Sequence, residues 1–236
     1  MLAIFLVHKT GYTRCMEKNI SIIGILLACV ILVGGLFAMT RPAAAPEILS
    51  TDQAALLAVQ SNDHTVGPKD AKVTVVEYYD FECPPCGAYH PILTELEKQH
   101  PDVQFVYRYF PLSGHLNAMH AALAAEAAAQ QGKFSEMKRA IFEHQDEWGG
   151  KDAADASLFV KYAQEIGLNI EKWEADRNSD AVKTRVEDSL KTGVTVGVRG
   201  TPTFYLNGAP LETPRSLEEF SQVLTAAKTA APTATE

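Results

Sequence analysis

The motif Cys83-Pro84-Pro85-Cys86 carries the most evident chemistry in the sequence. Two thiols separated by two residues can form a disulfide with each other and can exchange it with the thiols of another molecule. A thiol at the start of a helix is stabilised as a thiolate, because the first helical amides are unpaired and the helix dipole is positive there. We therefore expect Cys83 to be the nucleophile and Cys86, which follows one turn later, to be the resolving thiol.

Half of a zinc site is the alternative interpretation of this motif. Structural zinc takes four ligands, which often come as two C-x-x-C pairs. The chain has four cysteines, and Cys15 and Cys29 lie in an N-terminal basic and apolar segment, so no second pair follows the first. The nearest histidine, His90, is one helical turn from Cys86. The spacing thus favours redox chemistry, and we predict no metal and no cofactor.

Glu77 lies six residues before Cys83, in a stretch of β-branched and aromatic residues. Alternation along a strand places it on the same face as Val73 and Val75. A carboxylate beneath the two sulfurs can accept a proton from the resolving thiol during exchange. The other interpretation is a solvated glutamate on an edge strand.

The elements that must position these residues follow from local patterns. Val73–Asp80 and Val103–Tyr109 are predicted to be strands, and a helix is expected from Cys83 to about His100, with Pro84 in its first turn. Helical spacing then dominates, and the expected helices are Asn117–Gln131, Lys133–Gln145, Asp155–Ile166, Asn169–Asn178 and Asp180–Lys191. A final hairpin is predicted at Thr203–Leu206, Asn207-Gly208 and Pro210-Leu211, followed by a helix from Ser216 to about Ala227.

Two segments together resemble the DsbA-like branch of the thioredoxin superfamily: Val75–Cys86 and Gly197–Gly208, the second with Gly200-Thr201-Pro202-Thr203 before a strand. The resemblance covers about Val73 to Ala227. It implies an α/β fold, thioredoxin-like with an inserted helical subdomain at about 113–192. By position it implies the site residues: Cys83 as reactive cysteine, Cys86 as its partner, Glu77 as the acidic residue below the site, Pro202 as a cis-proline, and Thr201, Pro84 and Pro85 as substrate-facing residues.

One position departs from the resemblance. The best-known oxidases of this branch carry histidine where this chain has Pro85, and histidine helps to hold the thiolate. Proline supplies neither a charge nor an amide hydrogen. We predict a pKa for Cys83 between about 3.5 and about 7, the values for DsbA and thioredoxin. The reduction potential is accordingly predicted to be less oxidising than about −120 mV.

The N-terminal segment predicts a membrane anchor at 20–39, because Ile20–Met39 is an uncharged run that reaches roughly 30 Å as a helix. Lys9, Arg14 and Lys18 precede it, which keeps residues 1–19 cytoplasmic. Residues 40–69 are interpreted as a linker, 70–228 as the folded domain and 229–236 as a disordered tail. Open alternatives are signal cleavage after the Ala43-x-Ala45 pattern, a lipidated Cys29 after Leu26-Leu27-Ala28, and a true start at Met16.

Charge and the resemblance together define the expected partners. The formal net charge is −8. The residues up to and including Arg41 carry a net positive charge, so the rest of the chain is strongly acidic. No nucleic-acid partner is therefore expected. The resemblance implies an extracytoplasmic enzyme that forms disulfides in reduced exported proteins and is re-oxidised by a quinone-linked membrane partner. The alternatives are a membrane-tethered reductase or isomerase, and a thioredoxin-like chaperone or binding module without turnover.

Overall fold

The computed structural model describes residues 49–152 and 156–230. The predicted cytoplasmic segment 1–19, the anchor 20–39 with the alternatives to it, the first part of the predicted linker and most of the predicted tail lie outside these residues. Within the two described ranges, none of the helices is long and apolar enough to span a bilayer.

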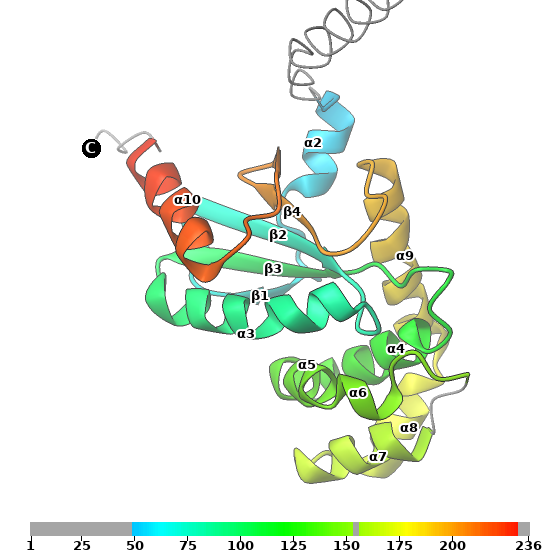
Figure 1. Ribbon diagram of the computed structural model, residues 1–236. Helices are drawn as coiled ribbons and strands as arrows, with labels where there is room; N and C mark the ends of the chain where they lie inside the picture. The colour runs from blue at the N-terminus through cyan, green and yellow to red at the C-terminus, as the bar shows by residue number, and fades with distance from the viewer. Residues whose placement is uncertain (1–48, 153–155, 231–236) are drawn as a thin grey trace, which may run out of the picture. The chain divides into compact units, whose positions relative to one another are not determined.

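A five-stranded sheet forms the centre of the fold (Figure 1), in the order β1-β3-β2-β4-β5. Its strands are β1 (His64–Val66), β2 (Val73–Tyr79), β3 (Val103–Tyr109), β4 (Thr203–Leu206) and β5 (Ala209–Leu211). β2 and β3 run parallel, and every other pair is antiparallel. The helix α3 (Pro84–Gln99) makes the crossover between the two parallel strands. The strands predicted from β-branched and aromatic residues are therefore confirmed, and β2 lies in the middle of the sheet.

In the described residues, six helices follow β3 before the chain returns to the sheet: α4 (Ala118–Ala129), α5 (Phe134–Glu143), α6 (Gln145–Trp148), α7 (Ala156–Glu165), α8 (Ile170–Arg177) and α9 (Asp180–Thr195). They match the predicted helical insertion at about 113–192. The alanine-rich α4 is at its centre, in contact with α5, α7, α8 and α9, because small side chains let helices approach closely. Trp173 of α8 donates through Nε1 to the carbonyl of Ala124 at 3.0 Å.

The two faces of the sheet bury two separate clusters. Alternation along β2 places Val75 and Tyr79 in the larger cluster, which α3 and the last helix α10 (Leu217–Ala230) cover. Val76 and Tyr78 point to the opposite face, where they pack with Leu57 and residues that follow α9. Glu77 shares its face with Val75 and Tyr79, so it lies on the side of α3, the helix that carries the cysteines.

The prediction that residues 40–69 form a linker is wrong for the second half of this segment, which contains a helix and a strand. Thr51–Leu57 forms α2, and Ser50 caps it in a capping box with Gln53. His64–Val66 forms β1, which pairs with β3 along one edge of the sheet. Three residues are too few for an alternating pattern to be visible in the sequence. Only pairing with β3 makes this segment a strand.

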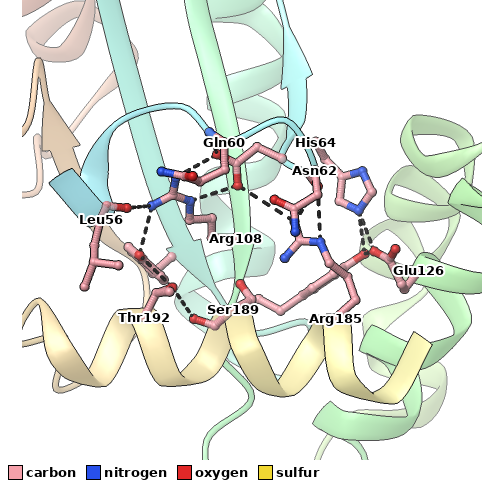
Figure 2. A network of polar contacts seen from close by, with 12 residues as sticks. Leu56, Gln60, Asn62, His64, Arg108, Glu126, Arg185, Ser189 and Thr192 are labelled. Carbon is pink, nitrogen blue, oxygen red and sulfur yellow. Dashed lines mark hydrogen bonds and ion pairs between the residues drawn. The ribbon is translucent and has the colours of Figure 1, made fainter. Parts of the chain in front are cut away.

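Arg108 fixes this N-terminal segment, residues 49–66, to the sheet (Figure 2). Its side chain is 3% exposed, and its Nη2 lies 2.6 Å from Oδ2 of Asp63, which is equally buried. The guanidinium also donates to the carbonyls of Leu56 (2.6 Å) and Ala58 (2.8 Å) and to the hydroxyl of Tyr78 (3.1 Å). A buried cation is stable only when its donors are paired, and Arg108 meets this condition through residues of α2 and the loop after it.

Two more contacts extend the network in Figure 2 to the helical insertion. Arg185 of α9 donates through Nε and Nη2 to the carbonyl of Asn62, at 3.1 and 2.7 Å. His64 Nε2 lies 2.6 Å from a carboxylate oxygen of Glu126 in α4. The N-terminal segment thus joins the sheet to two helices of the insertion.

Candidate active site

Cys83 is the residue that precedes the first turn of α3. Its backbone is extended, at φ −71° and ψ 118°, and Pro84 and Pro85 occupy the first two helical positions, where no amide hydrogen is needed. Both prolines are exposed, whereas Cys83 is 6% and Cys86 1% exposed. The two thiols are free in this structure. Cys83 is therefore the more accessible of the two cysteines.

The loop before β4 meets Cys83 across the fold. Cys83 Sγ lies 3.2 Å from the carbonyl oxygen of Thr201, and the Thr201–Pro202 peptide bond is cis. Both loop residues are half-buried. The structure therefore brings together the C-x-x-C motif and the Thr201-Pro202 pair, which the sequence separates by more than a hundred residues.

The two thiols have opposite electrostatic environments. A hydrogen bond from Cys86 is the largest influence that lowers the pKa of Cys83, to about 6, against the effect of burial. Burial is the main cause that raises the pKa of Cys86, and the carboxylate of Glu77 adds to it. The pKa of Cys83 lies inside the predicted interval. A stable thiolate beside a protonated buried thiol is the arrangement that thiol exchange requires.

Glu77 is buried, at 5% exposure, on the central strand β2. Its backbone lies opposite Tyr107 of β3 on one side and Phe204 of β4 on the other, so the edge-strand interpretation is wrong. Burial raises the pKa of Glu77 to about 8, and the charge of Cys83 acts in the same direction. A carboxyl group that gains and loses its proton near neutral pH suits proton transfer with a thiol.

Two buried carboxylates outside the C-x-x-C motif hold the loops around Cys83. Asp80 accepts from the amides of Glu82 (2.7 Å) and Leu112 (2.8 Å), and its Oδ2 lies 2.7 Å from Nδ1 of His115. Glu82 accepts from the amides of Asn117 (2.6 Å) and Gly150 (2.9 Å). Both carboxylates lie within the sequence Asp80-Phe-Glu-Cys83, directly before the motif. Their role in holding the loops becomes clear only from their burial in the structure.

A cavity of about 380 Å³ opens beside the motif, with Pro84, Glu82, His115 and Leu116 in its lining. Leu116, which lines this cavity, is 63% exposed. His90, the nearest histidine to Cys86, instead stacks on Phe142 with ring centroids 4.9 Å apart. In the described part of the chain, no group of three or more histidine, cysteine, aspartate or glutamate side chains is arranged to hold a metal ion.

Gln145 of α6 links the helical insertion to the reactive loop. Its Nε2 donates to the carbonyls of Phe81 (2.6 Å) and Cys83 (2.9 Å). Gly87 leaves the space that this side chain fills, because a Cβ there would lie 2.4 Å from Gln145 Oε1. No local pattern marks Gln145 as a site residue, since its partners lie more than sixty residues away.

Replacing Gln145 by leucine is expected to lower the free energy of unfolding by about 1–3 kcal/mol, because two carbonyls at the reactive loop lose their donor. Urea unfolding monitored by circular dichroism measures this change. Gln164→Leu, at an exposed position of α7 (Ala156–Glu165), is the control and should change it by less than about 0.5 kcal/mol. Equal free energies for the two variants would show that Gln145 does not support the loop.

Comparison with known proteins gives one family match. The sequence profile described as thioredoxin matches residues 60–226. Among curated proteins, a Na⁺/H⁺ antiporter NhaA 3 of Salinispora tropica is 38% identical over 169 residues, which are 70% of this chain and 24% of that protein. An antiporter NhaA 1 of Mycobacterium sp. (strain KMS) is 39% identical over 62% of this chain and 24% of its own length. The chain thus spans about a quarter of these relatives.

Solved structures share the fold. A thioredoxin-like oxidoreductase from Silicibacter pomeroyi superposes with a TM-score of 0.63 at 27% identity and covers 78% of this chain and 100% of its own. The α-DsbA1 protein of Wolbachia pipientis reaches a TM-score of 0.69 at 18% identity, over 76% of this chain and 97% of its own. BdbD from Bacillus subtilis reaches 0.64 at 22% identity, over 71% of this chain and 94% of its own.

Proposed function

Because the chain belongs to the thioredoxin family, in its DsbA-like branch, we propose that it is a membrane-tethered oxidoreductase that forms disulfides in exported proteins. The observation that carries this proposal is the contact of 3.2 Å between Cys83 Sγ and the carbonyl of Thr201. It places the thiol with the lowered pKa beside the backbone of the Thr201-Pro202 loop. A substrate cysteine that reaches the sulfur would pass along this loop.

The oxidised protein, with a Cys83–Cys86 disulfide, is the species that transfers oxidising equivalents. A substrate thiolate attacks the sulfur of Cys83, and the bond between the two protein sulfurs breaks. Cys86 leaves as a thiolate and takes up a proton, because its pKa is raised. The second substrate thiolate then attacks the substrate sulfur of the mixed disulfide. Cys83 is released as a thiolate, the substrate has lost two electrons, and the protein has gained them.

The groups around Cys83 suit a polypeptide substrate. Thr201 and Pro202 on one side are half-buried, and Pro84 and Pro85 on the other side are exposed. The two prolines have no amide hydrogen, so they offer an apolar surface without a competing donor. We therefore assign substrate contact to these four residues and proton transfer to Glu77.

The extracytoplasmic location rests on the N-terminal sequence, in which basic residues precede an uncharged run of membrane-spanning length. The proposed partners are reduced cysteine-containing proteins outside the cytoplasm and a quinone-linked membrane protein that restores the disulfide. The antiporter names belong to proteins about four times as long as the matched segment. Transport is therefore not part of the proposal for this chain.

The reduction potential of the pair is expected to be more negative than about −120 mV, the DsbA value. Pro85 supplies no charge to hold the Cys83 thiolate, and a less stabilised thiolate makes a weaker oxidant. Equilibration with mixtures of reduced and oxidised glutathione, followed by acid quenching and alkylation, measures this potential. Pro85→His is the informative variant and should move the potential toward more positive values. A wild-type potential at or above the DsbA value would contradict the expectation.

A reductase is the second candidate. Pro85 favours it as well, because a cysteine pair with a more negative reduction potential can be kept reduced by a membrane electron donor. Cells are first quenched in acid, which protonates the thiols and stops exchange. Alkylation of the free thiols then reports whether Cys83 and Cys86 were reduced or oxidised in vivo. A predominantly oxidised pair supports the oxidase, and a predominantly reduced pair supports the reductase.

A further inference from the structure

A carboxylate–histidine pair lies directly beside the reactive cysteine. Asp80, which is 1% exposed, places its Oδ2 at 2.7 Å from Nδ1 of His115. The backbone carbonyl of Asp80 accepts a hydrogen bond from the amide of Cys83 at 3.2 Å. The aspartate thus contacts both the histidine and the residue that carries the nucleophile.

The loop after β3 fixes the orientation of the His115 ring. The amide of Leu112 donates to Asp80 Oδ2 at 2.8 Å, and the amide of His115 donates to the carbonyl of Leu112 at 3.0 Å. An ionised carboxylate can only accept, so Nδ1 of His115 carries the hydrogen of its contact with Asp80. The His115 side chain is 27% exposed and lines the cavity beside Pro84. Its other nitrogen, Nε2, can therefore gain and lose a proton while Nδ1 stays bound.

Two buried acidic residues precede Cys83, and the two residues that follow it carry no charge. The hydrogen bond from Cys86 is the largest influence on the pKa of Cys83 and lowers it, whereas the charge of Asp80 raises it. Glu82 is the second buried acidic residue. A Cys83 thiolate in these surroundings is stabilised by a positive charge close by.

His115 is the side chain best placed to supply this positive charge. Among the described residues, the other charged side chains that line its cavity are Glu82, Asp146, Lys151 and Asp152. The last three are exposed, so water and salt screen their charges. A protonated His115 makes its pair with Asp80 neutral, whereas a neutral His115 leaves the pair with one negative charge. Histidine ordinarily changes between these states from about pH 5 to about pH 8.

We infer that His115 is a positioning residue for the proposed exchange: held by Asp80, it supplies the positive charge that stabilises the Cys83 thiolate. The inference deepens the proposed function and rests on it. The step concerned is the release of the substrate. The second substrate thiolate bonds to the substrate sulfur of the mixed disulfide, the bond to Cys83 breaks, and Cys83 keeps the electron pair as a thiolate. Stabilisation by His115 is present in acid and is lost as the pH rises and the imidazole loses its proton.

The ionisation of Cys83 tests this inference in the full-length protein. Reduced protein, with Cys15 and Cys29 replaced by serine, is alkylated with iodoacetamide between about pH 5 and about pH 9. This reagent is uncharged and reacts with the thiolate, so the rate of single addition, measured by mass spectrometry, follows the ionised fraction of Cys83.

Two substitutions and one control are compared in this assay. His115→Asn keeps an amide that can donate to Asp80 but never carries a charge, and Asp80→Asn removes the negative charge of the pair. His120→Asn is the matched control, because His120 is an exposed histidine of α4.

His115→Asn should move the midpoint of Cys83 ionisation to higher pH. A shift of one unit makes alkylation at pH 5 about tenfold slower and leaves the rate at pH 9 almost unchanged. The wild-type profile should be broader than a single-proton curve, because His115 and Cys83 lose their protons over the same range, and His115→Asn should restore the single-proton curve. Asp80→Asn should accelerate alkylation at pH 5, where histidine is ordinarily protonated. His120→Asn should give the wild-type profile.

Opposite effects of His115→Asn and Asp80→Asn at pH 5 cannot come from a general loss of loop structure, which would change both rates in the same direction. An unchanged rate at pH 5 in His115→Asn would overturn the inference, as would rates that change in the same direction in both variants. Disulfide transfer from the oxidised protein to a reduced dithiol peptide is measured separately. If this transfer failed while the ionisation profiles were as expected, the proposed function would be wrong, and not the charge of His115.

Discussion

Substitution of Cys83 by serine is expected to abolish disulfide exchange, with a fall in rate of at least about a thousandfold. Exchange needs a thiolate that attacks or accepts a sulfur, and the hydroxyl of serine is not ionised near neutral pH. The oxidation of a reduced dithiol peptide by the oxidised protein measures the rate. Cys15 and Cys29 supply the matched control, since neither is part of the C-x-x-C motif. Replacing both by serine should leave the rate unchanged.

Cys86→Ser should behave differently from Cys83→Ser, although it also stops turnover. The nucleophile remains, so the Cys83 thiolate should attack oxidised glutathione, release reduced glutathione and keep the other half as a mixed disulfide that the protein fails to resolve. Mass spectrometry of the non-reduced adduct then identifies Cys83 as the attached residue. If Cys83→Ser retained the oxidation of the peptide, the catalytic assignment would be wrong. A binding module without turnover would then explain the site around Cys83 better.

The second large effect concerns stability and the N-terminal segment 49–66. Asp63→Ala is expected to lower the free energy of unfolding by about 3–5 kcal/mol, because it leaves the buried charge of Arg108 without its carboxylate. Nε and Nη2 of Arg108 lie 3.0 and 2.6 Å from the two Asp63 oxygens. Little solvent reaches the pair to replace the lost contact, since both side chains are only 3% exposed. Urea unfolding followed by circular dichroism measures the loss.

Glu95→Gln is the control for that measurement. Glu95 pairs with Lys98 on the exposed side of α3, at 3.3 Å and with side chains 43% and 68% exposed. Exposed pairs of this kind contribute about 0–1 kcal/mol, so the control should differ little from the wild type. A loss below about 1 kcal/mol in Asp63→Ala would mean that the segment is held by its backbone contacts and not by this ion pair.

Local patterns in the sequence were sufficient for much of the fold. Continuous runs of β-branched and aromatic residues predicted β2 and β3, and apolar residues at helical spacing predicted the helices of the insertion. The turn at Asn207-Gly208 also followed from residue type, and both residues have positive φ, at 50° and 79°. Each of these elements is long enough, or specific enough, to be determined by neighbouring residues.

The elements that were missed depend on partners distant in the chain. β1 has three residues and becomes a strand only through β3, and Asp63 meets Arg108 across 45 positions. Alternation placed Glu77 on the correct face, but its burial depends on the order of strands in the sheet. Asp80 and His115 meet across 35 positions, and no local pattern predicts this contact.

Transfer of a disulfide from the full-length oxidised protein to an equimolar peptide with two reduced cysteines tests the central claim most directly. Samples are quenched in acid, alkylated and weighed by mass spectrometry. The peptide should lose two hydrogens while the pair Cys83 and Cys86 becomes alkylatable in the same proportion, and a peptide–Cys83 disulfide should appear in between. A peptide that stays reduced while the protein keeps its disulfide would contradict the account.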